Sequence, residues 1–371
     1  MPVHLPVQAH LLSPAARRTY YSNTTGRIYM QNPFTLTFGK SPLVPIERPV
    51  QTNEIIDAFT AEPVNQQMFI LTGVRGFGKT VMLTEISRKL KEKDDWIVIE
   101  LNPSADLLKS MLSKLNSNQV CANIIKSARI DLSLFGFGLS LEGAFPVSDA
   151  ETAVIMILEK LKNRGKKLLV TIDEITNNEF MRVFAGSFQI FVRHDLPIFL
   201  LATGLYENID DLQNEKNLTF LYRAPKIPLK PLNMQAMTRK YQTILETDSQ
   251  TAMKMAELTN GYPFAFQVLG YLTWNANGDF KSVLGDYEQY LSEFVYDKIW
   301  SELSKKDQIV AKGIADTESG RIMDIRALLN METNEFNPYR KRLIKKGIIS
   351  GEVRGYIYFT LPLFREYVMT H

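Results

Sequence analysis

Glycines, a lysine and a threonine are spaced as GxxxxGK[ST] over residues 73 to 80, inside the stretch MFILTGVRGFGKT. Glycines lack a Cβ, so the backbone can bring its amide N–H groups close around a polyphosphate. The Lys79 ammonium can reach the β- and γ-phosphates, and the Thr80 hydroxyl can hold Mg²⁺. The predicted ATP- and phosphate-binding residues are Gly73, Val74, Arg75, Gly76, Phe77, Gly78, Lys79 and Thr80.

The flanking segments suit this interpretation. Residues 68–71 are an apolar run of strand length, and apolar residues recur at helical spacing over 81–91. The motif would then lie between a buried strand and a helix whose N-terminus favours an anion. The alternative is a glycine-rich turn that ends in an ordinary lysine.

A second motif, LLVTIDE, ends in two carboxylates at Asp173 and Glu174. A carboxylate at the end of an apolar strand can orient the water shell of Mg²⁺ beside Thr80, so we assign Asp173 to the metal. One residue later, Glu174 can polarise the water that attacks the γ-phosphate. Strand-end acidic pairs also serve as turns or caps; the phosphate loop upstream favours the catalytic interpretation here.

Two further residues are catalytic candidates. Thr203 closes the apolar stretch LLATG, where a hydroxyl could contact the γ-phosphate or the attacking water, or could simply end a strand. Arg223 could stabilise transition-state charge on a phosphate, in cis or from a neighbouring subunit. It could equally form a surface salt bridge.

Composition excludes several classes of protein. The 371 residues are 45% hydrophobic and 22% charged, which is typical of a globular chain with two or three domains. No apolar run is long enough to cross a bilayer, so we expect no membrane partner and a cytoplasmic location. The lone Cys121 excludes an internal disulfide framework and a cysteine-based zinc site.

Strand-like apolar runs alternate with helical patterns through the first two thirds of the chain. The strands are predicted at 68–71, 96–101, 167–173, 197–203 and 226–232, and the helices at 81–91, 104–115, 149–163 and 178–193. This alternation predicts an α/β fold with a parallel sheet and a ligand at the carboxyl ends of the strands. Residues 129–142 alternate polar and apolar side chains, which predicts an inserted hairpin or edge strand.

The same patterns divide the chain into four parts. Residues 1–31 are expected to be a disordered extension, and residues 32–232 the phosphate-binding core. The core begins with a proline-rich loop that runs into a helix, residues 32–59, here called the lead-in, which would lie near the adenine. Residues 233–300 read as a helical lid, with Pro263 in the first turn of a helix. Residues 301–371 are predicted to form a winged helix, with helices near 305–316, 321–329 and 339–346 and strands at 348–353 and 356–361.

The third helix of that last part carries a basic face. Between Ser304 and His371 there are 12 Lys and Arg against 8 Asp and Glu, whereas the whole chain has a net charge of only +3. Contact with DNA phosphates would therefore come from this end, unless the helix is solvated surface or serves only a protein partner. The candidate DNA-contacting residues are Arg340, Lys341, Arg342, Lys345 and Lys346.

The motifs GVRGFGKT, LLVTIDE, LLATG and NGYPFAF, with the winged-helix end, resemble the AAA+/STAND-like P-loop ATPases of prokaryotes. Within these, the resemblance is to the archaeal-type ATPases, relatives of the replication-initiator ATPases. It covers roughly residues 32–371 and implies a P-loop NTPase of the additional-strand class with ATP and Mg²⁺ as cofactors. Thr203 would be the sensor on the fourth strand, and Pro263 would approach the base.

Two departures from that pattern favour a slow switch over a fast ring-type enzyme. The helix after Pro263 lacks the arginine that AAA+ initiators usually place there as a second sensor. The glycine and arginine pattern that the family has before its first strand is matched only loosely, by IERPVQTNE. The leading hypothesis is an ATPase switch coupled to a DNA or protein partner or to self-association. Its alternatives are a DNA-binding regulator with little or no hydrolysis and, more weakly, a small-molecule kinase.

Overall fold

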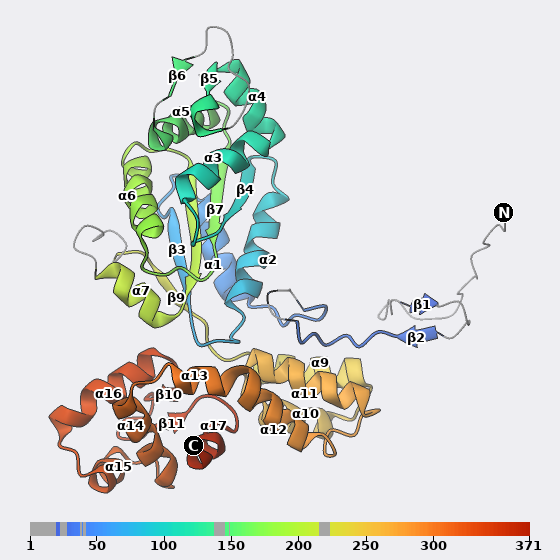
Figure 1. Cartoon of the computed structure of the whole chain (residues 1–371). Helices are drawn as coiled ribbons and strands as arrows, with labels where there is room; N and C mark the ends of the chain where they lie inside the picture. Colours follow the sequence, from blue (N-terminus) through green and yellow to red (C-terminus); the bar gives the residue numbers. More distant parts are fainter. Residues whose placement is uncertain are drawn as a thin grey trace.

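The structure, a computed structural model, describes residues 20–22, 28–37, 39, 42–136, 145–147, 149–214 and 223–371. Two short strands, β1 (Tyr20–Ser22) and β2 (Ile28–Met30), pair antiparallel near the N-terminus (Figure 1). Most of the predicted extension 1–31 lies outside the described residues, so its disorder stays a prediction. The rest of the chain forms an α/β core above a helical layer (Figure 1).

A parallel sheet forms the centre of the core, as the sequence predicted. Its strands are β3 (Met68–Thr72), β4 (Trp96–Leu101), β7 (Lys167–Ile172), β8 (Ile198–Gly204) and β9 (Lys226–Pro228). The strand order is β4-β7-β8-β3-β9, and every pair is parallel. Strand β8 lies between β3 and β7, which is the additional-strand arrangement of a P-loop NTPase. The predicted fold class is confirmed.

Helices cover both faces of the sheet (Figure 1). On one face lie α1 (Pro49–Thr60) and α2 (Lys79–Lys91). On the other lie α3 (Leu107–Ser117), α4 (Gln119–Ser127), α5 (Ala150–Lys162) and α6 (Glu179–Arg193). Side chains of a strand alternate between faces, so Phe69 joins the α1–α2 core and Ile70 joins the α3–α6 core.

The insert after α4 differs from the prediction. Strand β5 (Ile130–Asp131) pairs in parallel with β6 (Phe145–Pro146), and a 3₁₀ turn, Ser133–Phe135, follows β5. The Asp131 carboxylate accepts a hydrogen bond from the Ser133 N–H at 2.8 Å, which turns the chain and ends the strand. The predicted hairpin or edge strand is thus met only by the two residues of β5, whose pairing with β6 is parallel, and residues 133–135 form the 3₁₀ turn instead; residues 137–144 lie outside the described chain.

The predicted lid is helical. After β8 come α7 (Tyr206–Gln213) and β9, and then α9 (Met234–Leu245), α10 (Ser249–Leu258), α11 (Pro263–Asn275) and α12 (Leu284–Leu291). A π-helical turn, Ser292–Tyr296, joins α12 to α13 (Asp297–Ser301). One hydrophobic cluster runs from the α2 face of the sheet through this lid into the C-terminal part.

The C-terminal part has the element order predicted from the sequence. It contains α14 (Lys305–Asp316), α15 (Ile322–Leu329), α16 (Thr333–Lys345), β10 (Ile349–Ser350), β11 (Tyr358–Phe359) and α17 (Phe364–Thr370). Strands β10 and β11 pair antiparallel. Helix α16 begins at Thr333 although Pro338 lies inside it, because Phe336 is fully buried and fixes that first turn.

Candidate nucleotide site

The phosphate loop joins β3 to α2 at the carboxyl edge of the sheet, where the sequence predicted it. Its glycines have positive φ angles, 154° at Gly73, 75° at Gly76 and 84° at Gly78. The last two lie in the left-handed region, which glycine adopts at little cost. The loop thus turns sharply into the N-terminus of α2, where N–H groups and the helix dipole favour an anion.

Lys79 is the first residue of α2 and is almost completely buried, with 8% of its surface exposed. Its Nζ donates to the Gly73 carbonyl at 2.9 Å and to the Val74 carbonyl at 3.0 Å. Burial lowers the pKa of Lys79 to about 8; the charge of Arg75 acts in the same direction, and the carboxylates of Glu174 and Asp173 oppose it. A bound phosphate would favour the protonated ammonium.

Asp173 lies between two hydroxyl groups, one from the start of helix α2 and one from strand β8. The Thr80 Oγ1 donates to its Oδ2 at 2.7 Å, and the Thr203 Oγ1 donates to its Oδ1. Because β8 lies between β3 and β7, Thr203 reaches the end of β7 while Thr80 approaches from the phosphate loop. The structure thus brings together three residues that the sequence placed in one site.

Glu174 follows with a strained backbone. Its φ is 55°, in the left-handed region that side-chain-bearing residues rarely adopt, and its N–H donates to the Thr203 Oγ1 at 3.0 Å. Strain of this kind concentrates at functional sites. It turns the Glu174 side chain out of the sheet edge, so that this residue lines the same cavity as Lys79.

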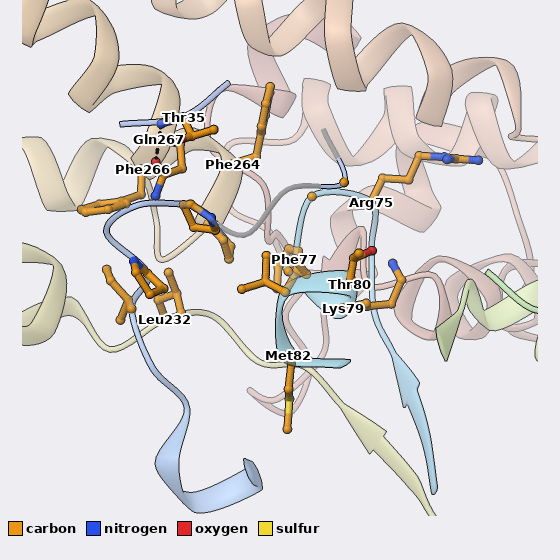
Figure 2. Close-up of a pocket in the computed structure, with 18 of the residues that line it drawn as sticks. Thr35, Arg75, Phe77, Lys79, Thr80, Met82, Leu232, Phe264, Phe266 and Gln267 are labelled. Atoms are coloured by element: carbon orange, nitrogen blue, oxygen red, sulfur yellow. Dashed lines mark hydrogen bonds between the residues drawn. The ribbon is translucent and has the colours of Figure 1, made fainter. Parts of the chain in front are cut away.

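A cavity of about 680 Å³ lies over the phosphate loop. That volume is within the range of small-molecule sites, roughly 300–1,000 Å³. Residues of the phosphate loop line one side, and the start of α11 lines another, as Figure 2 shows for Phe77 and Phe264. Pro263 is also among the lining residues. The lead-in contributes Thr35 and Thr37 to the cavity wall, and its closeness to the adenine stays a prediction.

The hydroxyl and carboxylate oxygens of Thr80 and Asp173 suit a magnesium ion. Mg²⁺ is commonly held by one or two protein oxygens together with substrate phosphates and waters. Over the described residues, no group of three or more His, Cys, Asp or Glu side chains could hold a metal by itself. Thr80 and Asp173 supply two such oxygens side by side.

Tyr262 holds the lid against the phosphate loop, a role that sequence reasoning missed. Its hydroxyl donates to the Arg75 carbonyl at 2.8 Å, and its ring lies 5.3 Å from the ring of Phe77. A Cβ on Gly76 would collide with the Tyr262 hydroxyl. The NGYP motif marked a turn before α11, but only the folded chain shows what its tyrosine contacts.

Gly76→Ala should destabilise the protein more than Gly78→Ala. Both positions have positive φ, which costs a side-chain-bearing residue about 1–2 kcal/mol. Only at Gly76 does the new methyl meet Tyr262, and forced overpacking adds about 1–3 kcal/mol. Urea unfolding of the two variants without nucleotide measures the difference. Equal losses would contradict the assigned contact.

Arg223 lies away from this site. It lines a separate cavity of about 360 Å³ together with residues 64–68 and the end of α6. This cavity is at the amino edge of the sheet, because Arg223 precedes β9 and residues 64–68 lead into and begin β3. Because the strands run parallel, the phosphate loop lies at the opposite edge of the sheet. The structure therefore does not bring Arg223 to the phosphate loop of the same chain.

Several basic side chains of α16, and Lys346 just after it, make contacts with other parts of the chain. Arg342 binds the buried Asp307 carboxylate with a shortest contact of 2.7 Å, and Lys346, just after the helix, pairs with Glu207 of α7. The Lys345 ammonium lies 5.0 Å from the centre of the Tyr206 ring. Lys341 is exposed, and Arg340 is half-buried. The predicted basic face therefore also serves as a contact with the core.

Two solved structures share this fold over most of the chain. The Walker-type ATPase PABY2304 of Pyrococcus abyssi superimposes with a TM-score of 0.62 at 15% identity, covering 88% of this chain and 96% of that one. The ORC2 protein of Aeropyrum pernix, in ADPNP and ADP complexes, gives 0.52 at 13% identity, covering 86% and 89%. This chain has the fold of these P-loop ATPases. The fold that the resemblance implied is thereby confirmed.

Sequence comparisons reach less of the chain. Residues 293–368 match a domain of unknown function (DUF8462). This range begins within the π-helical turn and covers nearly all of the C-terminal part. No curated protein matches the chain. In the described part of the chain, none of the helices has the length and apolar character needed to cross a membrane.

Proposed function

We propose that this protein is an ATP-binding, Mg²⁺-dependent ATPase that acts as a nucleotide switch for its C-terminal part. The observation that carries the proposal is the chain of contacts from Thr80 through Asp173 to the buried Thr203. Thr80 and Asp173 line one cavity together with Lys79. A phosphate loop alone would support nucleotide binding. The ordered carboxylate and the adjacent Glu174 support hydrolysis as well.

Each residue has a distinct part in the proposed reaction. The phosphate loop N–H groups and Lys79 would hold the β- and γ-phosphates, so the Lys79 ammonium would exchange the carbonyls of Gly73 and Val74 for phosphate oxygens. Thr80 and Asp173 would hold Mg²⁺, which supplies neutralisation of phosphate charge. Glu174 would orient the attacking water and accept its proton, and Thr203 would position that water or the γ-phosphate.

Contacts from the C-terminal side to the phosphate loop support coupling. Arg75 of the loop pairs with Glu302 at 2.8 Å, just after α13. A Cβ on Gly347, beyond α16, would come within 2.7 Å of Val74. These two contacts hold the C-terminal part against the phosphate loop, and the Lys346–Glu207 pair holds it against the neighbouring helix α7. A change of loop conformation on phosphate binding would therefore bias the position of that part.

The partner of this switch is proposed to be DNA or another protein. For DNA, the basic residues of α16 that are not held by carboxylates, such as the exposed Lys341, would contact the phosphates. Helix α11, PFAFQVLGYLTWN, carries no cation that could stabilise charge on the γ-phosphate. Turnover is therefore expected to be slow without a partner, and fast enough with one to reset the switch.

Phosphate release by the full chain tests this proposal. With ATP and MgCl₂ we expect slow turnover that EDTA abolishes, and mixed duplex DNA should change the rate or the ATP affinity if DNA is the partner. Because coupling is reciprocal, ATP and ADP should then give different DNA affinities by fluorescence anisotropy. A rate of phosphate release that is the same with and without DNA would favour a protein partner. Absence of both ATP binding and turnover would refute the proposal.

A further inference from the structure

The guanidinium of Arg75, in the phosphate loop, is held by a carboxylate from the C-terminal side. Its Nη2 donates to the Glu302 Oε1 at 2.8 Å, across 227 residues of sequence. Figure 2 shows the Arg75 side chain extending from the loop away from Lys79 and Thr80. The sequence predicted Arg75 as a phosphate-binding residue, whereas the anion that its guanidinium contacts in the structure is Glu302.

The contact with Glu302 satisfies the Arg75 guanidinium only in part. The Arg75 Nε is buried and has no hydrogen-bond partner among the residues that the structure describes. A buried donor without a partner is costly. A phosphate group presents three oxygens and commonly accepts from two N–H groups of one guanidinium at once. A phosphate would therefore satisfy Arg75 better than this carboxylate does.

Arg75 is within reach of a ligand in the nucleotide cavity. It lines that cavity together with Lys79, and it also lines a small neighbouring cavity of about 30 Å³ together with Glu302. The charge of Arg75 lowers the pKa of Lys79, so the two cations act on each other. The Arg75 carbonyl accepts from the Tyr262 hydroxyl at 2.8 Å, which holds the backbone. A change of partner therefore needs only the Arg75 side chain to turn.

Glu302 is fixed in place by the packing of its neighbours. It follows α13, and the flanking Ile299 and Leu303 are buried. The same Oε1 that accepts from Arg75 lies 3.4 Å from the Lys298 Nζ. Glu302 therefore keeps a cation when Arg75 leaves it, which lowers the cost of breaking the pair. The carboxylate stays at a place that the C-terminal part sets.

We propose that Glu302 is a specificity-determining residue that makes the site distinguish ATP from ADP, because it competes with the γ-phosphate for Arg75. The inference rests on the proposed function, since it assumes that the cavity holds a nucleotide with its phosphates on the loop. ADP has no γ-phosphate and leaves the Arg75–Glu302 pair intact. ATP breaks the pair, because its terminal phosphate carries more negative charge than one carboxylate and offers more acceptors.

This competition makes the contact between the phosphate loop and the C-terminal part depend on the third phosphate. Glu302 lies within the range 293–368 and is tied to the loop through Arg75. With ADP the tie remains, and with ATP it is released. About a third of each side chain of the pair is exposed, so we expect a modest effect on affinity. An ion pair with no part in binding could be removed without changing the affinity for either nucleotide.

Nucleotide affinities of the full chain test the inference. The Kd values of ADP and of the hydrolysis-resistant analogue ADPNP would be measured with MgCl₂ by isothermal titration calorimetry. Glu302→Gln should tighten ADPNP binding by about threefold to fivefold, the equivalent of a partly exposed ion pair, and leave the Kd of ADP within about twofold. Arg75→Gln should weaken ADPNP binding by about tenfold or more and change the Kd of ADP by less than about twofold.

The double variant separates competition for Arg75 from general electrostatics. Removal of any negative charge near the cavity could favour the more highly charged nucleotide, and Glu302 also pairs with Lys298. If Arg75 carries the effect, Glu302→Gln gives no gain in ADPNP affinity in the Arg75→Gln background. Glu293→Gln removes the same charge from an exposed position in the π-helical turn, where it bonds Gln289, and should change neither affinity.

The possible failures of the inference and of the proposed function can be told apart. The inference alone would be overturned by equal tightening of ADPNP and ADP in Glu302→Gln, or by tightening of neither. A gain that persists in the Arg75→Gln background, or that Glu293→Gln reproduces, would overturn it as well. In each of these cases the nucleotides still bind. A wild-type protein that binds neither ADPNP nor ADP would overturn the proposed function with it.

Discussion

Lys79→Ala should weaken ATP binding by about 3 kcal/mol or more, roughly a hundredfold, because the phosphates lose a charge-assisted donor inside a buried loop. Lys79 is 8% exposed and its ammonium already lies in the loop, so little side-chain entropy is lost when it meets a phosphate. Isothermal titration calorimetry with ATP and MgCl₂ measures the loss.

The matched control is Lys91→Ala in the same helix. Lys91 is exposed in the last turn of α2, at the opposite end from the phosphate loop, and does not line the cavity. ATP affinity should therefore be unchanged in this variant. If Lys79→Ala bound ATP as tightly as Lys91→Ala does, the phosphates would have to lie elsewhere in the cavity, and the assignment of the loop would be refuted.

Glu174→Gln should stop turnover and leave ATP bound. The amide keeps the size of the side chain but cannot accept a proton from water, and loss of a positioned base lowers rates by about 10²- to 10⁴-fold. The Glu174 N–H bond to Thr203 is made by the backbone, so it survives the substitution. Phosphate release should fall by this factor while the Kd for ATP stays within about twofold, less than 0.5 kcal/mol.

Asp173→Asn provides the contrasting variant. The Asp173 carboxylate accepts from both Thr80 and Thr203, so an amide would leave one of these hydroxyls without its acceptor and remove a magnesium ligand. We expect this variant to lose Mg²⁺-dependent binding as well as turnover. If Glu174→Gln hydrolysed ATP at the wild-type rate, the protein would need another base, and Glu174 would be an exposed residue at the end of a strand.

The sequence predicted the core because two kinds of local signal agree there. The strands that carry the site are continuous apolar runs, and the glycine pattern requires a strand before it and a helix after it. Asp173, Glu174 and Thr203 end such strands, so parallel pairing alone brings them to one edge. The contacts of Thr80 and Thr203 with Asp173 follow from β8 lying between β3 and β7.

Features that depend on distant contacts were not predictable from local pattern. Helix α4 was missed because the predicted helix ended at residue 115 and residues 119–127 were assigned no element, although Asn118 accepts from the N–H groups of Val120 and Cys121 and so caps this helix. Tyr262 contacts the phosphate loop across 187 residues of sequence, and Arg342 binds Asp307 across 35.

The nucleotide that stays bound after incubation with ATP and MgCl₂ tests the central claim most directly. Wild-type protein and Glu174→Gln would be incubated, separated from free nucleotide by rapid gel filtration, denatured and analysed by ion-exchange chromatography. The account predicts that the wild type holds ADP and has released phosphate, while Glu174→Gln holds intact ATP. Intact ATP on both proteins, with no phosphate released, would contradict hydrolysis at this site, and no nucleotide on either would contradict the site itself.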